Sequence, residues 1–239
     1  RNSLVVMQIA LSMALLTSAG LFLKSLSNVS RVALGVQVDN MATFAVSPLR
    51  VGYDTLRAKV LYARMEDELA AQPGVTAVTS SMVPLLSGDS WGNNVRVQGF
   101  ECLPDVDCNS RWNAIGADYF AKMGVTPKAG RDVLATDVDG GPRVAVVNQA
   151  FVDKFNLGPD AVGKFMADGR GDSLTIQIVG VVPNVKYNDV KRAPEAVFYR
   201  PWTQSGIVSR MYFYVRTNLL PEQLVGTMPK VMASIDPVL

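Results

Sequence analysis

Hydrophobic residues are distributed in two different ways along this chain. Residues 4–23, LVVMQIALSMALLTSAGLFL, form a stretch of twenty residues without a charge. A helix needs roughly 20 apolar residues to cross a bilayer, so this stretch predicts a membrane-spanning helix. Beyond Arg31 the chain contains charges, turn residues and mixed periodicity. We therefore expect an anchor within residues 1–30 and a folded domain outside the membrane after it.

Two other interpretations of residues 4–23 remain open. A secretory signal peptide has a shorter apolar core, of roughly 7 to 15 residues, and a small-residue cleavage site, to which TSAG at 17–20 corresponds only loosely. A buried helix of a soluble domain usually carries a polar face, and few polar side chains occur here. The apolar stripe continues through Phe22, Leu26 and Val29, which predicts a short stalk beyond the bilayer.

A strand, a helix and a second strand are predicted next. Residues 43–49 (TFAVSPL) and 75–83 have strand-like composition. Between them, Asp54 is a good N-cap, and Pro73 follows the predicted end of the helix. The apolar face of this helix consists of Ala58, Leu61, Tyr62, Met65 and Leu69. The pattern indicates a β-α-β unit.

The last part of the chain has the pattern of one more strand and helix. Residues 210–217 (RMYFYVRT) are rich in aromatic and β-branched side chains, and Pro221 suits the first turn of a helix. The apolar stripe of that helix would be Leu224, Met228, Val231, Met232 and Ile235. With the β-α-β unit this predicts an α+β, ferredoxin-like lobe of the split β-α-β type. Its closing strand would lie beyond Leu239, and because the sequence also lacks an initiating Met we expect a fragment of a longer protein.

The residues between these units are predicted to form an inserted, mainly β lobe. Strand patterns occur at 94–100, 110–115, 143–148, 174–182 and 196–202, and short helices fit 117–123 and 149–155. The predicted division is therefore a transmembrane helix and stalk at 1–30, the first part of the ferredoxin-like lobe at 31–86, the insertion at 87–205 and the second part of the lobe at 206–239.

Composition restricts the partners and the chemistry. The chain has 23 Lys+Arg against 21 Asp+Glu, a net charge of +2, and no dense basic cluster. We therefore expect protein or membrane lipid as partners, and no nucleic acid. It has no histidine, which removes the commonest general base and the commonest zinc ligand. We expect no enzyme activity, no catalytic or metal-binding residues and no cofactor.

Two glycine-rich motifs resemble catalytic signatures, and each lacks a required part. The stretch from Gly88 to Gly92 matches G-x-S-x-G, but no histidine can activate Ser90 and its flanks do not predict a strand followed by a helix. The stretch from Gly158 to Phe165 matches G-x-x-x-x-G-K, but Phe165 stands where a Ser or Thr must bind magnesium. It also leads into an expected strand instead of opening a helix, so we expect no ATP binding.

Two further motifs are interpreted as turns. Residues 137–140 (DVDG) begin like a calcium-binding loop but lack the third oxygen ligand and the closing Glu, so a surface turn is expected. The tripeptide Arg170-Gly171-Asp172 lies between two strand patterns, where glycines suit a hairpin turn.

The only two cysteines, Cys102 and Cys108, are six residues apart in the turn-rich segment ECLPDVDC. This spacing is compatible with a disulfide that closes a small loop, and its formation requires an oxidising compartment. Two reduced thiols in a cytosolic loop are the alternative. The positions of Arg1, Lys24 and Arg31 do not decide which side of the membrane this loop faces.

Six short stretches follow one another between residues 115 and 202. They are IGADYFAKMGV, AGRDV, PRVAVVNQAFVDKF, DAVGKF, IVGVVPNVKYNDV and PEAVFYRPW. In this order they resemble the MacB-like periplasmic core domain of FtsX-type ABC transporter permeases. Residues 4–26 resemble the membrane helix that precedes that domain, particularly in duplicated permeases. Related permeases usually lack cysteines, so the loop at 102–108 departs from the family.

The resemblance implies a porter-like lobe of ferredoxin-like fold and an inserted sabre-like lobe. It implies a bacterial inner (cell) membrane protein whose residues after about 30 face the periplasm. The function implied is that of the extracytoplasmic domain of a permease subunit, which couples cytoplasmic ATP hydrolysis to periplasmic conformational change for export or efflux. The implied partners are a cytoplasmic ABC ATPase, a second permease half or a homodimer mate, and a periplasmic adaptor protein. A single-anchor binding or sensor module and an anchored hydrolase using Ser90 are the alternatives.

Overall fold

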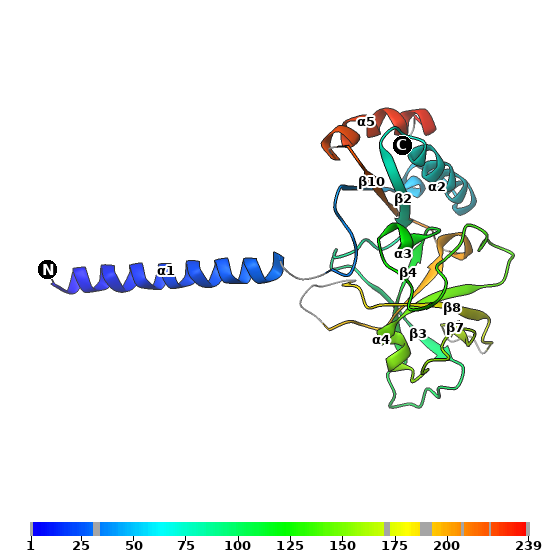
Figure 1. Ribbon diagram of the computed structural model, residues 1–239, viewed down its shortest axis with the longest axis horizontal. Helices are drawn as coiled ribbons and strands as arrows, with labels where there is room; N and C mark the ends of the chain where they lie inside the picture. Colours follow the sequence, from blue (N-terminus) through cyan, green and yellow to red (C-terminus); the bar gives the residue numbers. More distant parts are fainter. Residues whose placement is uncertain are drawn as a thin grey trace.

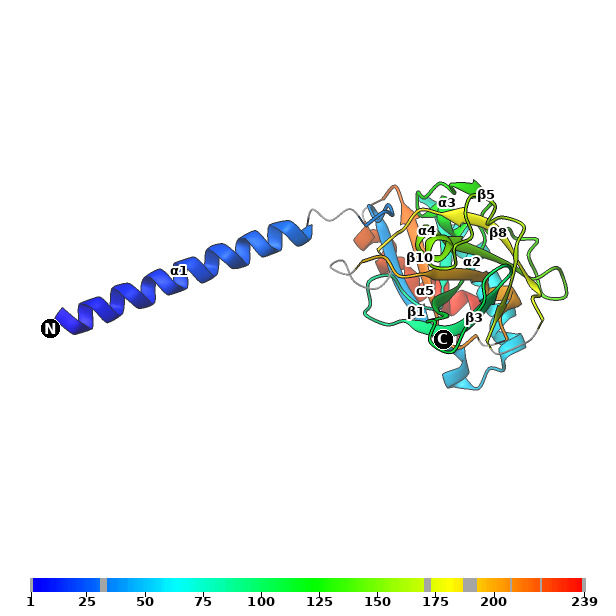
Figure 2. The ribbon, with the colours of Figure 1, turned by 90° about the horizontal axis from the view of Figure 1, so that it is seen from below.

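The computed structural model describes residues 2–30, 34–169, 173–186, 193–206, 208–219 and 221–237. Helix α1 (Asn2–Ser30) stands apart from the folded remainder (Figures 1 and 2). From Ser3 to Ser27 it is long and apolar enough to cross a membrane, and 0% of its most apolar window is buried. The predicted N-terminal helix is confirmed, and a buried core helix does not fit this exposure.

Three hydroxyl groups in the middle of α1 make hydrogen bonds within the helix. Ser12, Thr17 and Ser18 each donate a hydrogen bond of 2.8 Å to the carbonyl oxygen four residues earlier. An unbonded hydroxyl is expensive in hydrocarbon, because lipid offers no partner in place of water. These three hydroxyl groups are therefore compatible with a position inside a bilayer.

Three strands and two helices form the first folded part, which we call the three-stranded lobe. Strand β10 (Met211–Thr217) lies between β1 (Met41–Val46) and β2 (Val75–Ser81) and is antiparallel to both. The register places Phe213 opposite Phe44 and, on its other side, opposite Ser80. Helices α2 (Thr55–Ala70) and α5 (Pro221–Ile235) contact each other and this sheet.

Helix α2 forms as its sequence predicts. The Asp54 side chain accepts the Arg57 backbone N–H at 2.7 Å, which satisfies one of the donors left unpaired in the first turn. The predicted apolar face is buried in full, namely Ala58, Leu61, Tyr62, Met65 and Leu69. In α5, Met228, Val231 and Ile235 are buried as predicted, whereas the side chain of Leu224 is outside the described residues.

The first predicted strand was placed too far along the chain. Strand β1 ends at Val46, and residues Pro48–Val51 form a short 3-10 helix, η1, instead of continuing it. Proline has a fixed φ and no N–H, so Pro48 favours the first turn of a helix. Gly52 then closes η1 in the left-handed conformation, which glycine adopts without strain.

The inserted region forms a closed ring of six strands, which we call the ring lobe. Its strands are β3 (Trp91–Val97), β4 (Asn109–Ile115), β6 (Val144–Asn148), β7 (Phe165–Asp168), β8 (Ile176–Val182) and β9 (Val197–Pro201). They are hydrogen-bonded in the order β4-β3-β7-β8-β6-β9, and β9 pairs in parallel with β4 to complete the ring. Closure removes the free edges that an open sheet would present.

The remaining elements of the ring lobe are short. Two helices, α3 (Tyr119–Lys122) and α4 (Gln149–Lys154), and a 3-10 helix, η2 (Trp202–Gln204), cover it, and β5 (Ala129–Gly130) pairs with β8. The predicted strands and helices of this region are confirmed to within a few residues, including the strand expected after the glycine-rich loop at 158–165. Strand β5 was not predicted, because two residues carry no periodicity.

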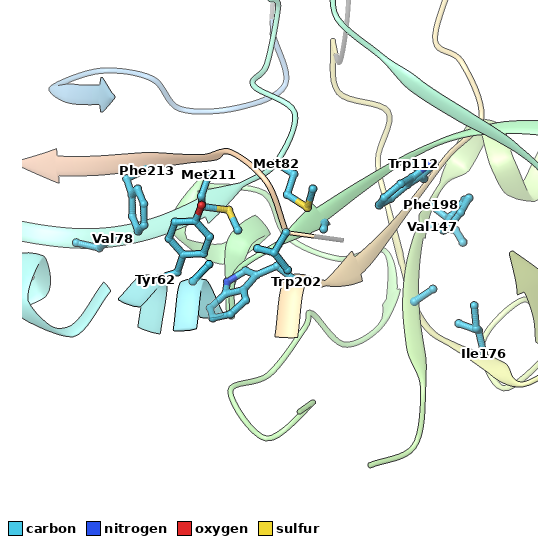
Figure 3. Close-up of a cluster of buried hydrophobic side chains, with 14 of the residues drawn as sticks. Tyr62, Val78, Met82, Trp112, Val147, Ile176, Phe198, Trp202, Met211 and Phe213 are labelled. Atoms are coloured by element: carbon cyan, nitrogen blue, oxygen red, sulfur yellow. The ribbon is translucent and has the colours of Figure 1, made fainter. Parts of the chain in front are cut away.

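One hydrophobic core extends through both lobes. It runs from Tyr62 and Phe213 in the three-stranded lobe, past Met82 and Trp202, to Phe198 in the ring (Figure 3). The backbone pairing between the lobes is short: Ser81 of β2 is paired with Ile115 of β4, and the Met82 and Gly116 N–H groups donate to the Ala114 and Ser80 carbonyl oxygens, each at 2.9 Å. Side-chain packing, more than the sheet, therefore joins the two lobes.

Candidate functional site

The serine of the G-x-S-x-G match lies in a loop. Ser90 directly precedes β3, and no helix follows it. A nucleophile elbow needs a strand before the serine, a helix after it and a base within hydrogen-bonding distance. The local structure does not have the first two, and the sequence contains no histidine.

The glycine-rich loop at 158–165 connects α4 to β7. Its Gly163 backbone N–H donates to the Ile178 carbonyl at 2.8 Å, and the Lys164 N–H donates to the Ala161 carbonyl at 3.3 Å. Backbone donors that are engaged inside the protein cannot cradle a phosphate. These two donors are therefore not free to bind a phosphate.

The acidic residues at 137–140 make ion pairs with the protein's own cations. The Asp137 carboxylate accepts hydrogen bonds from both terminal nitrogens of Arg131, at 2.7 and 2.9 Å. It also accepts a hydrogen bond from the Leu134 backbone N–H at 2.8 Å. Asp139 lies 3.7 Å from the Lys59 ammonium. No cluster suited to a metal ion occurs among the described residues. The Arg170-Gly171-Asp172 tripeptide lies outside the described residues.

Three side chains of α2 contact the ring lobe at a place that we call the joint. The Lys59 ammonium donates to the Thr203 carbonyl at 2.7 Å. The Tyr62 ring meets the Trp202 ring edge to face, with centroids 6.2 Å apart. Since Lys59 and Tyr62 are separated by nearly one helical turn, they lie on the same side of α2. The ring lobe therefore packs directly on this helix (Figure 3).

Glu66, one turn further along α2, is the third residue of the joint. Its carboxylate accepts the Ser80 hydroxyl at 2.5 Å and also the side-chain N–H of Trp202. Burial raises the pKa of Glu66 above its usual value, and the hydrogen bond from Ser80 opposes that rise. The carboxylate thus links β2 of its own lobe to η2 of the ring lobe.

A buried ion pair lies in the ring lobe. The Arg200 guanidinium contacts the Asp168 carboxylate at 2.6 Å, with side chains only 11% and 9% exposed. Asn93 donates to the same carboxylate at 2.7 Å, and the guanidinium lies over the Trp112 ring at 4.6 Å. The pair therefore connects strands β9, β7 and β3. Burial lowers the pKa of Arg200, and the Asp168 charge opposes that fall.

Several polar residues of the sequence motifs hold the fold together. In AGRDV, the buried Asp132 accepts the Phe120 and Ala121 backbone N–H groups at 2.8 and 3.1 Å, which caps α3. In PRVAVVNQAFVDKF, Asn148 caps α4 through the Phe151 N–H and also accepts the Val197 N–H of β9. These contacts explain the motifs structurally and assign them no chemistry.

The cysteines lie on the loop between β3 and β4. Their sulfurs are bonded, and their Cα atoms are 6.0 Å apart. The loop is also held by Lys154 of α4, whose ammonium contacts Asp107 at 2.7 Å and the Asn109 carbonyl at 2.6 Å. A hollow of about 420 Å³ lies beside it, lined by the loop and by β3 residues such as Val95.

Sequence reasoning did not identify the residues of the joint or of the buried ion pair. Asn148 could have been found, because an Asn directly before a helical pattern is a typical N-cap. Arg200 also carried a signal, since a charged residue inside the apolar strand AVFYRPW needs a buried partner. Glu66 carried none, because its spacing is that of any solvent-exposed helical residue.

Comparison with known families gives the identity of this domain. The family described as the MacB-like periplasmic core domain matches residues 3–229. The chain belongs to this family. The match includes most of α1, both lobes and the joint, and it confirms the resemblance seen in the sequence. No significant match is found among curated proteins.

Two solved structures have a similar fold. The periplasmic region of MacB from Actinobacillus actinomycetemcomitans is similar with a TM-score of 0.57 at 15% identity, over 87% of this chain and 89% of that one. The extracellular domain of the ABC-type transporter YknZ from Gram-positive bacteria is similar with a TM-score of 0.50 at 16% identity, over 73% and 81%. At such identities the likeness shows the fold alone. The chain is thus a MacB-like periplasmic core domain of α+β fold, preceded by an apolar helix.

Proposed function

We propose that this chain is the extracytoplasmic domain of an ABC transporter permease subunit, with α1 crossing the bacterial inner membrane and residues after about 30 facing the periplasm. The observation that carries this proposal is the family match, which runs from the apolar helix through both lobes. The domain would couple ATP hydrolysis by a cytoplasmic ABC ATPase to a movement on the other side of the membrane. Export or efflux would be the result of that movement.

The two lobes correspond to the proposed porter-like and sabre-like parts. The order β1-β10-β2, with the central strand antiparallel to both neighbours, is the order of three of the four strands in a ferredoxin-like sheet. The ring lobe would be the sabre-like insertion, entered near residue 87 and left near residue 205.

The joint supports a mechanical role. A displacement passes from one lobe to the other only if the contacts between them resist shear, as close-packed side chains do. Tyr62, Trp202 and Glu66 provide such packing together with hydrogen bonds. Partners of the full transporter would be the ATPase, a second permease half or second copy, membrane lipid and a periplasmic adaptor protein.

The mechanical role is tested at the end of α1. A flexible Gly-Ser segment inserted after Ser27 should abolish export by the reconstituted permease and its ATPase, because flexible linkers do not transmit displacement. Folding and membrane insertion should remain intact. Ser90→Ala serves as the control and should leave export unchanged. Normal export with the flexible insert, or its loss with Ser90→Ala, would contradict the proposal.

A further inference from the structure

A small cleft that contains two arginines lies where the three-stranded lobe meets the ring lobe. Its volume is about 280 Å³. Arg50 of η1 and Arg210, directly before β10, line it from the three-stranded lobe, and Trp91 of β3 lines it from the ring lobe. The loop that crosses between the lobes, residues 84–90, contributes Asp89. The residues of the joint and of the buried ion pair are not part of this cleft.

Arg210 is oriented by two hydroxyl groups of its own lobe. Its Nε–H donates to the Ser47 hydroxyl at 3.1 Å, and one terminal nitrogen donates to the Tyr212 hydroxyl at 3.3 Å. Ser47 and Tyr212 also line the cleft, so they hold the guanidinium at its wall. A guanidinium has five N–H donors, and these two hydrogen bonds leave three of them for a ligand.

Neither arginine of the cleft has a carboxylate partner among the residues that the structure describes. Several other arginines of the chain do form ion pairs, namely Arg64, Arg111, Arg131 and Arg200. The Arg50 side chain makes no hydrogen bond or ion pair with the described residues, and Asp89 is not close enough to either arginine to form one. Two like charges at one cleft repel each other, and an anion between them removes that repulsion.

The charges of the cleft favour a ligand with a single negative charge. Arg50 and Arg210 supply two positive charges against the one negative charge of Asp89. The hydrogen bond with Tyr212 raises the pKa of Arg210, and the nearby Asp89 charge adds a smaller rise, so Arg210 stays ionised. A carboxylate would make the cleft neutral, whereas a dianionic phosphate would be repelled more strongly by Asp89. Arginine also matches a carboxylate with two parallel N–H donors.

The apolar part of the cleft favours a ligand that also carries a ring. The half-buried Trp91 ring packs edge to face on Trp112, with centroids 5.1 Å apart, which fixes its orientation. Leu49, which is 39% exposed, and Met82 complete the apolar wall. An aromatic ring can pack on the accessible part of an indole. Because pockets for drug-sized molecules measure roughly 300–1,000 Å³, this cleft suits a smaller molecule.

We propose that this cleft binds a small aromatic carboxylic acid. Its carboxylate lies between Arg50 and Arg210, and its ring packs on Trp91, so the ligand contacts both lobes at once. This site goes beyond the proposed function, because binding requires neither ATP hydrolysis nor transport. The headgroup of an anionic phospholipid is also a monoanion, but it has no ring to pack on Trp91, so the free acid fits the cleft better.

Ligand-observed NMR titration of phenylacetate against the full chain in nanodiscs tests the site. Phenylacetate should bind more tightly than phenylacetamide, its neutral analogue with the same ring. Arg50→Gln should raise the Kd about fivefold or more, because it removes a charge-assisted hydrogen bond, and it breaks no described side-chain contact of the fold. The matched control is Arg143→Gln, at an exposed arginine directly before β6, which should leave the Kd unchanged. Equal binding of the amide, or an equal effect of the two substitutions, overturns the proposal.

Two further measurements identify the occupant of the cleft. Asp89→Asn should lower the Kd for phenylacetate about threefold or more, because a like charge beside the carboxylate is removed. A purely structural role of the two arginines predicts no such gain, so an unchanged Kd in Asp89→Asn contradicts the proposal. A soluble short-chain phosphatidylglycerol should not displace phenylacetate, and displacement would assign the cleft to a lipid headgroup instead. These measurements involve no transport, so failure of the proposed function would leave their result unaffected.

Discussion

At the scale of single residues, the charged groups that matter most are the buried ones. Arg200 and Asp168 are almost fully enclosed, whereas Arg111 and Glu195 form a similar pair with side chains 32% and 31% exposed. A buried pair gains little over an apolar replacement but is costly to break, because one charge is left without a partner. An exposed pair is screened by water and contributes little.

Asp168→Ala should therefore lower the free energy of unfolding by about 3–5 kcal/mol, because it leaves the buried Arg200 charge unpaired. Chemical denaturation followed by tryptophan fluorescence measures this change. The matched control is Glu195→Ala, which should cost about 1 kcal/mol or less. Equal decreases in the free energy of unfolding from the two substitutions would show that burial of the ion pair does not determine the effect of breaking it.

Glu66 should make stability depend on pH. Its pKa in the folded protein is raised by burial, so protonation favours the folded state, and the free energy of unfolding should fall as pH rises through the folded pKa. Glu66→Gln keeps an oxygen that accepts the Ser80 hydroxyl and cannot ionise. The variant should match the original at low pH and be more stable than it at pH 8. Chemical denaturation midpoints of both proteins, measured between low pH and pH 8, test this prediction. A stability difference between the two proteins that does not change with pH would contradict it.

At the scale of elements, helix caps and cross-links between neighbouring segments stabilise the local structure. Asp54 caps α2, Asn148 caps α4, and the loop between β3 and β4 is held by Cys102, Cys108 and the contact of Lys154 with Asp107. The disulfide stays a prediction for the protein in its cell, because it requires the periplasmic location that we propose for this loop.

Protein exported to the periplasm should contain Cys102 and Cys108 as a disulfide. Non-reducing peptide mapping should recover the two peptides linked, and replacing both cysteines by alanine should lower the free energy of unfolding by about 2 kcal/mol, since the closed loop is small. Recovery of both residues as free thiols from exported protein would show that the loop is not oxidised.

At the scale of the whole molecule, the two lobes share one core. Tyr62, Met82 and Trp202 belong to the same cluster of buried apolar residues as Phe198 in the ring. Lobes joined only by the short β2–β4 pairing would be free to shift, whereas interdigitated side chains resist such a shift. This packing is what lets the folded part act as one body.

Thermal unfolding of the folded part should therefore give one cooperative transition, because neither lobe can open without exposing the core of the other. Calorimetry measures this directly. Trp202→Ala should weaken the coupling, since it removes the aromatic contact with Tyr62 and the hydrogen bond to Glu66, and it should separate the transition into two. Two transitions in the unmodified protein would mean that the lobes are independent.

The sequence by itself determined the elements that depend on local physics. The uncharged stretch at 4–23, the Asp54 cap with its buried face of α2, and the β-branched strand at 210–217 all follow from periodicity, capping and propensity within a few turns of chain. The six ordered motifs contain such local signals too, since Asn148 of the third motif caps α4.

Only the tertiary structure decided how distant segments meet. The parallel pairing of β9 with β4, the pairing of Arg200 with Asp168 and the position of Glu66 between Ser80 and Trp202 join residues that are separated by 14 to 136 positions. No local pattern specifies such partners, because each depends on the packing of the whole chain. The two faces of α2 show this difference. The sequence predicted which apolar face turns toward the core, and only the fold showed that Leu56 and Val60 on the other face stay exposed.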